Sequence, residues 1–212
     1  MQTTTFKSVN LDNKSVRQIL RAAQDLWTRD GYHGASLKEI AAAAGVAKSL
    51  VHYHFESKEH LLVALQSDWC HRVARAVRAR LAATPPSTAA AGAALDQVFE
   101  AMVMTRAQFP FALELWRQSV TSPAVRDRLR AFDGELRGLY VEGLAATLGP
   151  LAGQLAVPLP RAAALIQAVL DGLGLRLFLE DDVAAVRRTF EDARAALLAA
   201  LLPSPPPSRL PS

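Results

Sequence analysis

Hydrophobic positions recur at helical spacing along most of the chain, and beyond residue 93 no segment has the alternation typical of a β-strand. Short segments rich in Gly, Pro and Ser interrupt this pattern. We therefore predict an all-α fold. The expected helices cover residues 16–30, 37–44, 47–54, 58–83, 93–108, 111–120, 123–148, 161–180 and 183–202.

Capping residues mark the helices near the N-terminus. Ser36 is followed three residues later by Glu39, and such a capping box satisfies N–H groups that the start of a helix leaves unpaired. Gly45 supplies the left-handed conformation that ends the same helix. Ser15 and Gln18 are interpreted as a second capping box, at the start of the first helix. The pattern around Ser36 and Gly45 predicts a helix-turn-helix.

The second helix of this motif, residues 47–54, has two chemically different faces, because each residue advances by about 100°. One face carries Ala47, Val51 and His54, with Phe55 just beyond the helix. The opposite face carries Lys48, Ser49, His52 and Tyr53, with Leu50 at the boundary. A short face that is polar, aromatic and partly cationic suits the major groove of DNA.

Charge and composition fit a DNA-binding module joined to a less charged domain. The formal net charge is +4, and all five lysines lie within the first 58 residues. Half of the residues are hydrophobic, but no run of 18 apolar residues and no apolar signal core indicates membrane insertion or secretion, so we expect a cytoplasmic protein. Cys70 is the only cysteine, which excludes an internal disulfide and a cysteine-based zinc site.

Breaks in the pattern predict four segments. A Pro and Ser break at residues 84–92 separates the later helices from the basic N-terminal part. The segments are a flexible arm over residues 1–12, a DNA-binding domain over 13–73 with its helix-turn-helix at 36–55, a second helical domain over 74–202, and a disordered Pro-rich tail over 203–212.

Residues 13–73 resemble the TetR family of transcriptional regulators. The resemblance rests on a leading helix that ends in DGYHGAS, on the turn KEIAAAAGVAKS, and on HYHFESKEHLL, which is similar to the family's aromatic, His, Phe, Ser, Lys, Glu, Leu pattern. Beyond residue 90 only the helical architecture is similar. The resemblance implies a C-terminal domain for ligand binding and dimerisation, and a homodimeric repressor that a small, largely apolar ligand releases from a palindromic operator.

The resemblance also assigns roles to residues of the predicted interface. Lys48 and Ser49 lie where the family contacts base edges, Tyr53 and Lys58 lie where it contacts phosphates, and Ser36 lies where a helix start meets the DNA backbone. Two outward positions depart from the common pattern, because His52 replaces a usual tyrosine and Leu50 a frequent threonine or serine. We expect a weaker or pH-sensitive phosphate contact at His52 and an apolar contact from Leu50 to a thymine methyl group.

The last two predicted helices are joined by only two residues, Asp181 and Asp182, so they form an antiparallel hairpin. Gly172 and Gly174 lie within the first of them, where each costs about 1 kcal/mol relative to alanine. Close packing against a second copy of the hairpin explains their presence. The expected dimerisation residues are Ala168, Gly172, Leu175 and Leu179.

Aromatic and methionine side chains concentrate between residues 99 and 116. They either line a ligand cavity or fill the core, and the pattern leaves both interpretations open. Glu114 and Arg117 in this region are interpreted as part of a solvated helix face. The candidate ligand-pocket residues are Phe99, Met102, Phe109, Phe111 and Trp116.

Other classes of function have less support. The sequence has no phosphate loop, nucleophile elbow or HExxH motif, so we expect no enzymatic activity and no cofactor. His52, His54 and His60 are not expected to bind a metal, because side chains two residues apart on a helix diverge. The alternative is a dimeric helical scaffold, or a DNA-binding protein that a partner rather than a small molecule controls.

Overall fold

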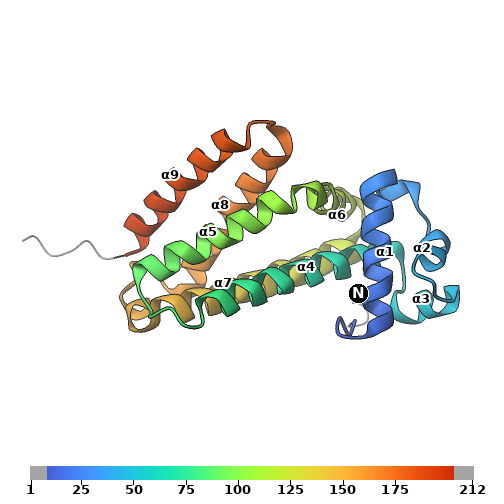
Figure 1. Ribbon diagram of the computed structural model, residues 1–212, viewed down its shortest axis with the longest axis horizontal. Helices are drawn as coiled ribbons and strands as arrows, with labels where there is room; N and C mark the ends of the chain where they lie inside the picture. The colour runs from blue at the N-terminus through green and yellow to red at the C-terminus, as the bar shows by residue number, and fades with distance from the viewer. Residues whose placement is uncertain (1–8, 203–212) are drawn as a thin grey trace, which may run out of the picture. The chain divides into compact units, whose positions relative to one another are not determined.

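The computed structural model describes residues 9–202, which are helical and contain no strand within that range (Figure 1). The predicted all-α fold is therefore confirmed. The elements are α1 (Lys14–Asp30), η1 (Tyr32–Gly34), α2 (Leu37–Ala43), α3 (Lys48–His54), α4 (Lys58–Leu81), α5 (Thr88–Met104), η2 (Arg106–Gln108), α6 (Phe109–Thr121), α7 (Pro123–Leu148), η3 (Gly149–Gln154), α8 (Leu159–Leu179) and α9 (Val183–Leu201).

The chain forms two compact units. The first contains the residues up to Val73 together with Thr105–Leu136, and the second contains Ala74–Met104 and the residues from Arg137 onward. The helix-turn-helix therefore shares its unit with α6 and the first half of α7. The sequence pattern alone places those residues in the C-terminal domain, so the compact units differ from the predicted domain boundaries.

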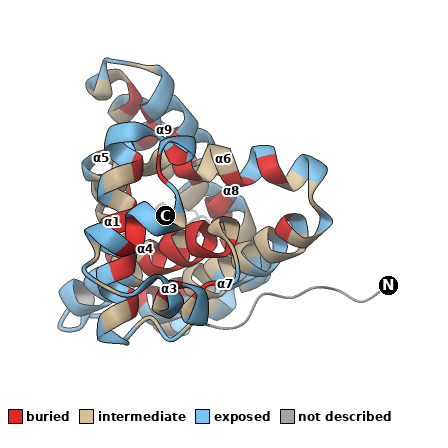
Figure 2. Cartoon of the chain, turned by 90° about the vertical axis from the view of Figure 1, so that its right-hand side faces the viewer, coloured by how far each residue is buried: buried red, intermediate tan, exposed pale blue. Residues whose placement is uncertain are grey.

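The core of the first unit explains why α6 belongs to it. Trp27 of α1 is 1% exposed and packs against Phe111 of α6, with ring centroids 6.0 Å apart. Leu115 of α6 and Val125 of α7 lie in the same buried cluster. Figure 2 shows buried residues, in red, along α1 and α4. Burial of each large apolar side chain contributes about 1.5–3 kcal/mol to the free energy of folding. These buried side chains hold α6 against the core of the helix-turn-helix.

The second unit is organised around α5, α8 and α9. Helices α8 and α9 form the predicted antiparallel hairpin, and the Asp182 side chain caps α9 by accepting from the backbone N–H groups of Ala184 and Ala185 at 2.9 and 3.1 Å (Figure 1). Phe99 of α5 stacks on Phe190 of α9, with ring centroids 4.2 Å apart and planes 4° from parallel. Ion pairs between Glu100 and Arg187 and between Asp96 and Arg194 join the same two helices.

Helices α1 and α5 both begin earlier than predicted. Helix α1 is capped by Asn13 rather than by Ser15, because the Asn13 side chain accepts from the N–H groups of Ser15 and Val16 at 2.9 and 3.3 Å. Helix α5 begins five residues before the predicted Ala93 because Ser87 caps it, accepting from Ala90 N–H at 3.1 Å. Both caps are short polar side chains whose use depends on where the preceding chain packs.

Helix α6 and the segment after α7 also differ in extent. Helix α6 begins at Phe109, two residues before the predicted start, and holds Pro110 in its first turn, where a missing N–H costs nothing. The segment after Leu148 continues as the 3-10 helix η3 rather than as an irregular loop. Most of the predicted arm, residues 1–8, and the whole predicted tail, residues 203–212, lie outside the described residues.

Among residues 9–202, α8 alone is long and apolar enough to cross a membrane by length and composition. Length and composition are weak evidence for a membrane span, because the core helix of a helical bundle meets the same criteria. Its most hydrophobic window is 44% buried inside the protein. Ile166, Leu170, Leu173 and Leu177 provide the buried side of α8.

Candidate nucleic-acid interface

The predicted capping box positions the start of α2. Ser36 N–H donates to the Glu39 carboxylate at 2.7 Å, the Ser36 hydroxyl donates to the same carboxylate oxygen at 2.7 Å, and Glu39 N–H donates to Ser36 Oγ at 3.3 Å. The bond from Ser36 N–H is the main reason that the pKa of Glu39 lies below its usual value. This confirms the predicted helix start at Leu37. Ser36 itself remains exposed, as a backbone contact to DNA requires.

The turn between α2 and α3 depends on one glycine, as predicted. Gly45 has φ +65° and donates its N–H to the Ala42 carbonyl at 3.1 Å. Val46 is half-buried against the core, and its N–H donates to the Ala41 carbonyl at 3.0 Å. A positive φ is costly for residues with a Cβ, which explains why glycine occupies this position. The backbone conformation of Gly45 in turn sets the angle between α2 and α3.

Replacing Gly45 with alanine is expected to destabilise the protein by about 1 kcal/mol, because alanine is strained at positive φ although space is open around the position. Gly134→Ala provides a matched control in the interior of α7, where the site is also open and φ is not positive. There alanine is expected to stabilise by up to about 1 kcal/mol. Urea unfolding of both variants measures the change in the free energy of unfolding. Equal changes in the two variants would contradict the claim that the positive φ of Gly45 requires glycine.

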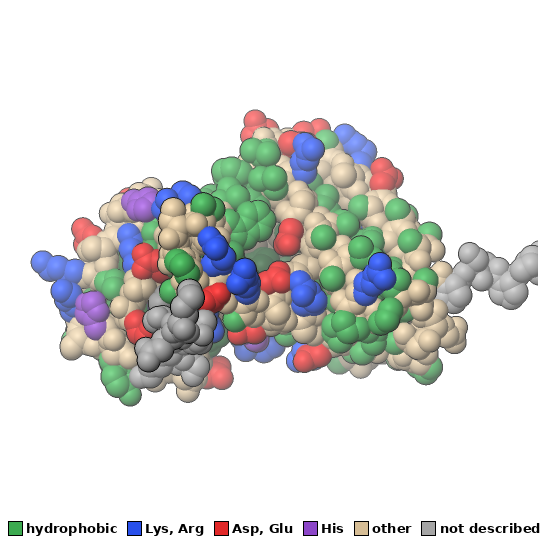
Figure 3. Space-filling model, turned by 180° about the vertical axis from the view of Figure 1, so that it is seen from behind, with side chains coloured by type: hydrophobic (Ala, Val, Ile, Leu, Met, Phe, Trp, Pro, Cys, Tyr) green, Lys and Arg blue, Asp and Glu red, His purple; other side chains and the backbone are tan. Residues whose placement is uncertain are grey.

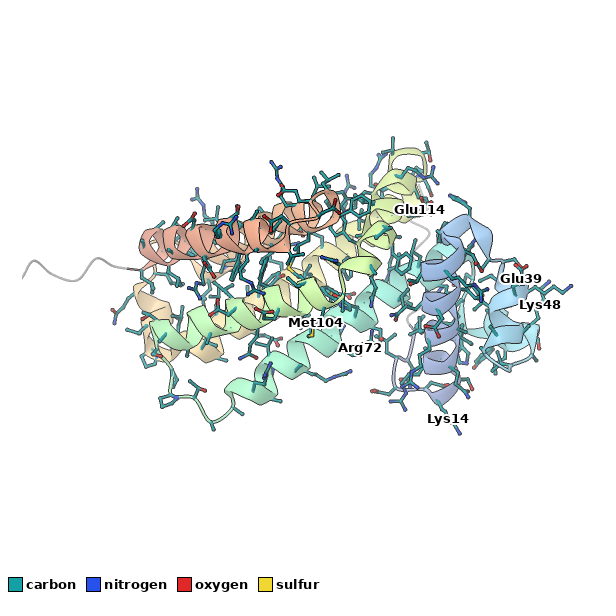
Figure 4. All side chains as sticks on the ribbon, turned by 45° about the horizontal axis from the view of Figure 1, so that its top comes forward. Lys14, Glu39, Lys48, Arg72, Met104 and Glu114 are labelled. Carbon is teal, nitrogen blue, oxygen red and sulfur yellow. The ribbon has the colours of Figure 1, made fainter. Side chains whose placement is uncertain are left out.

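Helix α3 presents the face that the sequence predicts. Val51 and the following Phe55 are 0% exposed and fix the helix to the core of the first unit. Lys48, Ser49 and His52 are exposed, and Tyr53 is 66% exposed. Figure 4 shows Lys48 projecting outward from α3, and Figure 3 shows Lys, Arg and His side chains on the surface of this unit. Leu50 is half-buried, as expected for a residue at the boundary of the two faces.

The turn between α3 and α4 is fixed by His60. His60 is 1% exposed, and its Nδ1 accepts from Glu56 N–H at 3.2 Å, so this nitrogen carries no proton. The backbone N–H of His60 donates to Ser57 Oγ at 3.1 Å, so Ser57 caps α4. Phe55 packs edge-on against the His60 ring, with centroids 5.8 Å apart. The imidazole therefore fixes the chain between Tyr53 and Lys58.

Lys58, the predicted phosphate contact at the start of α4, is half-buried. Its ammonium lies 4.4 Å from the centroid of the Tyr32 ring, a cation–π geometry. Burial lowers the pKa of Lys58, and the carboxylates of Glu59, Glu114 and Glu39 oppose that shift. Lys58 is thus held by η1 and surrounded by acidic groups, unlike the freely exposed Lys48.

Glu114 of α6 was not expected in this region. Its side chain is only 12% exposed, whereas the sequence pattern suggested a solvated face, so that interpretation is wrong for Glu114. Arg117, its ion-pair partner, is 61% exposed and does face solvent. The placement of Glu114 follows from Phe111 and Leu115 on the same helix, which turn it toward η1. Helical periodicity gives the buried side of α6 but not the unit that this side packs against.

The candidate pocket residues fall into both compact units. Phe99 is 0% exposed in its stack with Phe190, and Met102 is half-buried in the second unit. In the first unit Phe111 is 3% exposed against Trp27, Phe109 is half-buried and Trp116 is 44% exposed. Phe99 and Phe111 therefore act as core residues here. A pocket lined by the whole set stays a prediction.

The candidate dimerisation residues share the exposed side of α8. Ala168 and Gly172 are exposed, and Leu175 and Leu179 are 37% and 63% exposed. Nothing lies within 4 Å of a Cβ built at Gly172. Leu165, at 45% exposed, extends the same side by one turn. The result is a contiguous apolar face, and exposed faces of this kind commonly mark interaction sites.

Comparison with known families covers both parts of the chain. Residues 19–65 match the profile of bacterial regulatory proteins of the tetR family. Residues 87–203, more than half of the chain, match the C-terminal profile of BetI-type transcriptional repressors. The chain belongs to the TetR family. The sequence-based identification of the family is therefore confirmed.

Individual TetR-family relatives are similar over limited stretches. The HTH-type transcriptional regulator RutR of Escherichia coli strain K12 is 40% identical over 62 residues, which is 29% of this chain and 29% of RutR. The chain thus spans less than a third of the length of this curated relative.

Solved structures extend the similarity of fold to nearly the whole chain. A protein described as a transcriptional regulator from Saccharomonospora viridis, in complex with choline, has a TM-score of 0.64 at 20% identity and covers 90% of this chain and 99% of its own. FadR from Bacillus subtilis, in complex with stearoyl-CoA, has a TM-score of 0.68 at 18% identity and covers 87% and 98%. At these identities the likeness is one of fold.

Proposed function

We propose that this protein is a cytoplasmic, homodimeric transcriptional repressor that binds a palindromic operator and is released from it by a small, largely apolar ligand. One observation carries the proposal. Helix α3 is fixed to the core by Val51 and Phe55 while Lys48, Ser49, His52 and Tyr53 stay exposed. A rigid helix with a polar and cationic outer face is the form that reads a major groove.

In this proposal the interface residues divide between base reading and phosphate binding. Lys48 and Ser49 contact base edges, and Leu50 contacts a thymine methyl group with the part of its side chain that stays accessible. Tyr53, Lys58, Ser36 and His52 contact the backbone, which fixes the register of the protein on DNA without specifying sequence. The DNA-binding domain is proposed to cover residues 13–73.

A dimer is proposed because one α3 exposes too few residues for a specific site. The apolar face of α8, formed by Leu165, Ala168, Gly172, Leu175 and Leu179, supplies an interface for the second copy. The two-fold symmetry of such a dimer requires an operator with two symmetric half-sites.

Release by a ligand requires that the ligand bind more tightly to the arrangement that does not fit DNA. The second unit, residues 74–104 with 137–202, has an apolar core and is proposed to hold that ligand. Fold relatives hold choline in one case and stearoyl-CoA in another. These two molecules differ in size and charge. The proposal therefore specifies only that the ligand of this protein has an apolar portion.

Selection from random duplex DNA tests the proposal. The intact protein is expected to enrich an inverted repeat whose half-sites are about 10 base pairs apart or a multiple of that spacing. Acyl-CoA and quaternary ammonium compounds are then added to the complex, and one class is expected to release DNA. Enrichment of unrelated sequences would contradict the regulator, whereas an inverted repeat that no small molecule affects would favour control by a protein partner.

A further inference from the structure

Glu114 links α6 to the turn that precedes the helix-turn-helix. Its carboxylate accepts from Arg117 at 2.9 and 2.7 Å and from Gln118 Nε2 at 2.7 Å, and His33 Nε2 of η1 lies 3.4 Å away. The Arg117 hydrogen bonds are the main reason that the pKa of Glu114 lies below its usual value. A nearly buried carboxylate with this many partners holds a fixed position.

The contacts continue from Glu114 to the phosphate-contact lysine. Tyr32, which follows the cap of η1, is 8% exposed. His33 and Tyr32 are adjacent in η1, and their rings pack edge to face with centroids 5.1 Å apart. The Tyr32 ring in turn supports the Lys58 ammonium at 4.4 Å. A continuous set of contacts therefore joins an α6 carboxylate to a residue proposed to bind DNA.

We propose that Glu114 is a positioning residue of the DNA interface, which holds η1 and, through His33 and Tyr32, the Lys58 ammonium where it meets a phosphate. This inference rests on the proposed function of the α3 surface and specifies how α6 acts on it. Figure 4 labels Glu114 on α6, and Glu39 and Lys48 on the helix-turn-helix.

Positioning and simple electrostatics predict opposite effects for Glu114→Gln. The substitution removes a negative charge near the DNA-binding surface, and by charge alone this would strengthen binding to DNA. The glutamine keeps the size of the side chain but weakens its bonds to Arg117, Gln118 and His33. Loss of positioning therefore predicts weaker binding, in spite of the more favourable net charge.

Binding of the selected operator is measured for the full-length protein across a range of salt concentrations. Lys58→Gln is expected to reduce the slope of log K against log salt by about one per protomer. Glu114→Gln is expected to weaken binding about tenfold and to reduce the slope in the same direction. In the double variant, Glu114→Gln should weaken operator binding little beyond the effect of Lys58→Gln alone. Glu142→Gln is the matched control, since Glu142 is an exposed carboxylate on α7 that accepts from Arg78 at 2.9 Å.

Equal or tighter operator binding by Glu114→Gln, or full additivity with Lys58→Gln, would overturn the inference. Hydrogen exchange of the DNA-free protein gives an independent result. Gly34 N–H donates to the Gly31 carbonyl at 3.1 Å within η1, and this amide should exchange faster in Glu114→Gln than in wild type or Glu142→Gln. Unchanged exchange would also refute the role of Glu114. If wild type selects no operator, the proposed function fails while the exchange experiment still decides whether Glu114 holds η1.

Discussion

Replacing Lys48 with alanine is expected to remove most of the specific affinity for the operator. Lys48 is exposed at the start of α3, so its loss leaves the core intact and should not change the melting temperature measurably. A base contact of this kind contributes about 2 kcal/mol. The proposed dimer carries two copies of this contact, so the expected loss is about 4 kcal/mol, or roughly a thousandfold in affinity.

Fluorescence anisotropy with a labelled operator measures this change. Arg130→Ala is the control, because Arg130 is an exposed cation on α7 that pairs with Asp127 at 3.3 Å. Removing that cation should alter binding by less than about threefold. Similar losses in both variants would mean that net charge, and not the face of α3, accounts for DNA binding.

Gly172→Leu is expected to convert the proposed dimer into monomers. Within one protomer a side chain at Gly172 meets nothing within 4 Å, so leucine should stabilise the isolated helix by up to about 1 kcal/mol. If a second α8 packs closely at this position, the same leucine prevents the approach of the two helices. The variant should therefore be a folded monomer that binds the operator weakly, because two half-sites no longer act together.

Sedimentation velocity and thermal unfolding, measured on the same samples, separate the two effects. Gly134→Leu serves as the control, since Gly134 is an exposed glycine in α7 that is equally open in the protomer. That variant should remain dimeric. A Gly172→Leu protein that stays dimeric would place the interface elsewhere on the surface.

The parts of the fold that sequence predicts well are those with local physical causes. Ser36 with Glu39, Gly45 and the Asp181–Asp182 turn each specify a boundary through bonds or torsions within a few residues. Asn13 and Ser87 show the limit of this reasoning, because several nearby polar residues can cap a helix. The side chain that does so depends on the packing of the chain before it.

The parts that sequence does not predict depend on contacts between distant residues. The apolar spacing of Phe111 and Leu115 predicts a buried side of α6, but only the structure places that side against Trp27. The same packing turns Glu114 inward and brings it near His33, 81 positions earlier in the chain. For the candidate interface, the exposed face of α3 follows from helical geometry, whereas the support of Lys58 by Tyr32 does not.

The most direct test of the account is a titration of the intact protein against its selected operator and against a scrambled duplex of equal length, at several salt concentrations. The account predicts that the operator is bound at least about a thousandfold more tightly than the scrambled duplex. It also predicts that both affinities fall linearly on a logarithmic plot as salt rises. Equal affinity for the two duplexes, or binding that does not depend on salt, would contradict it.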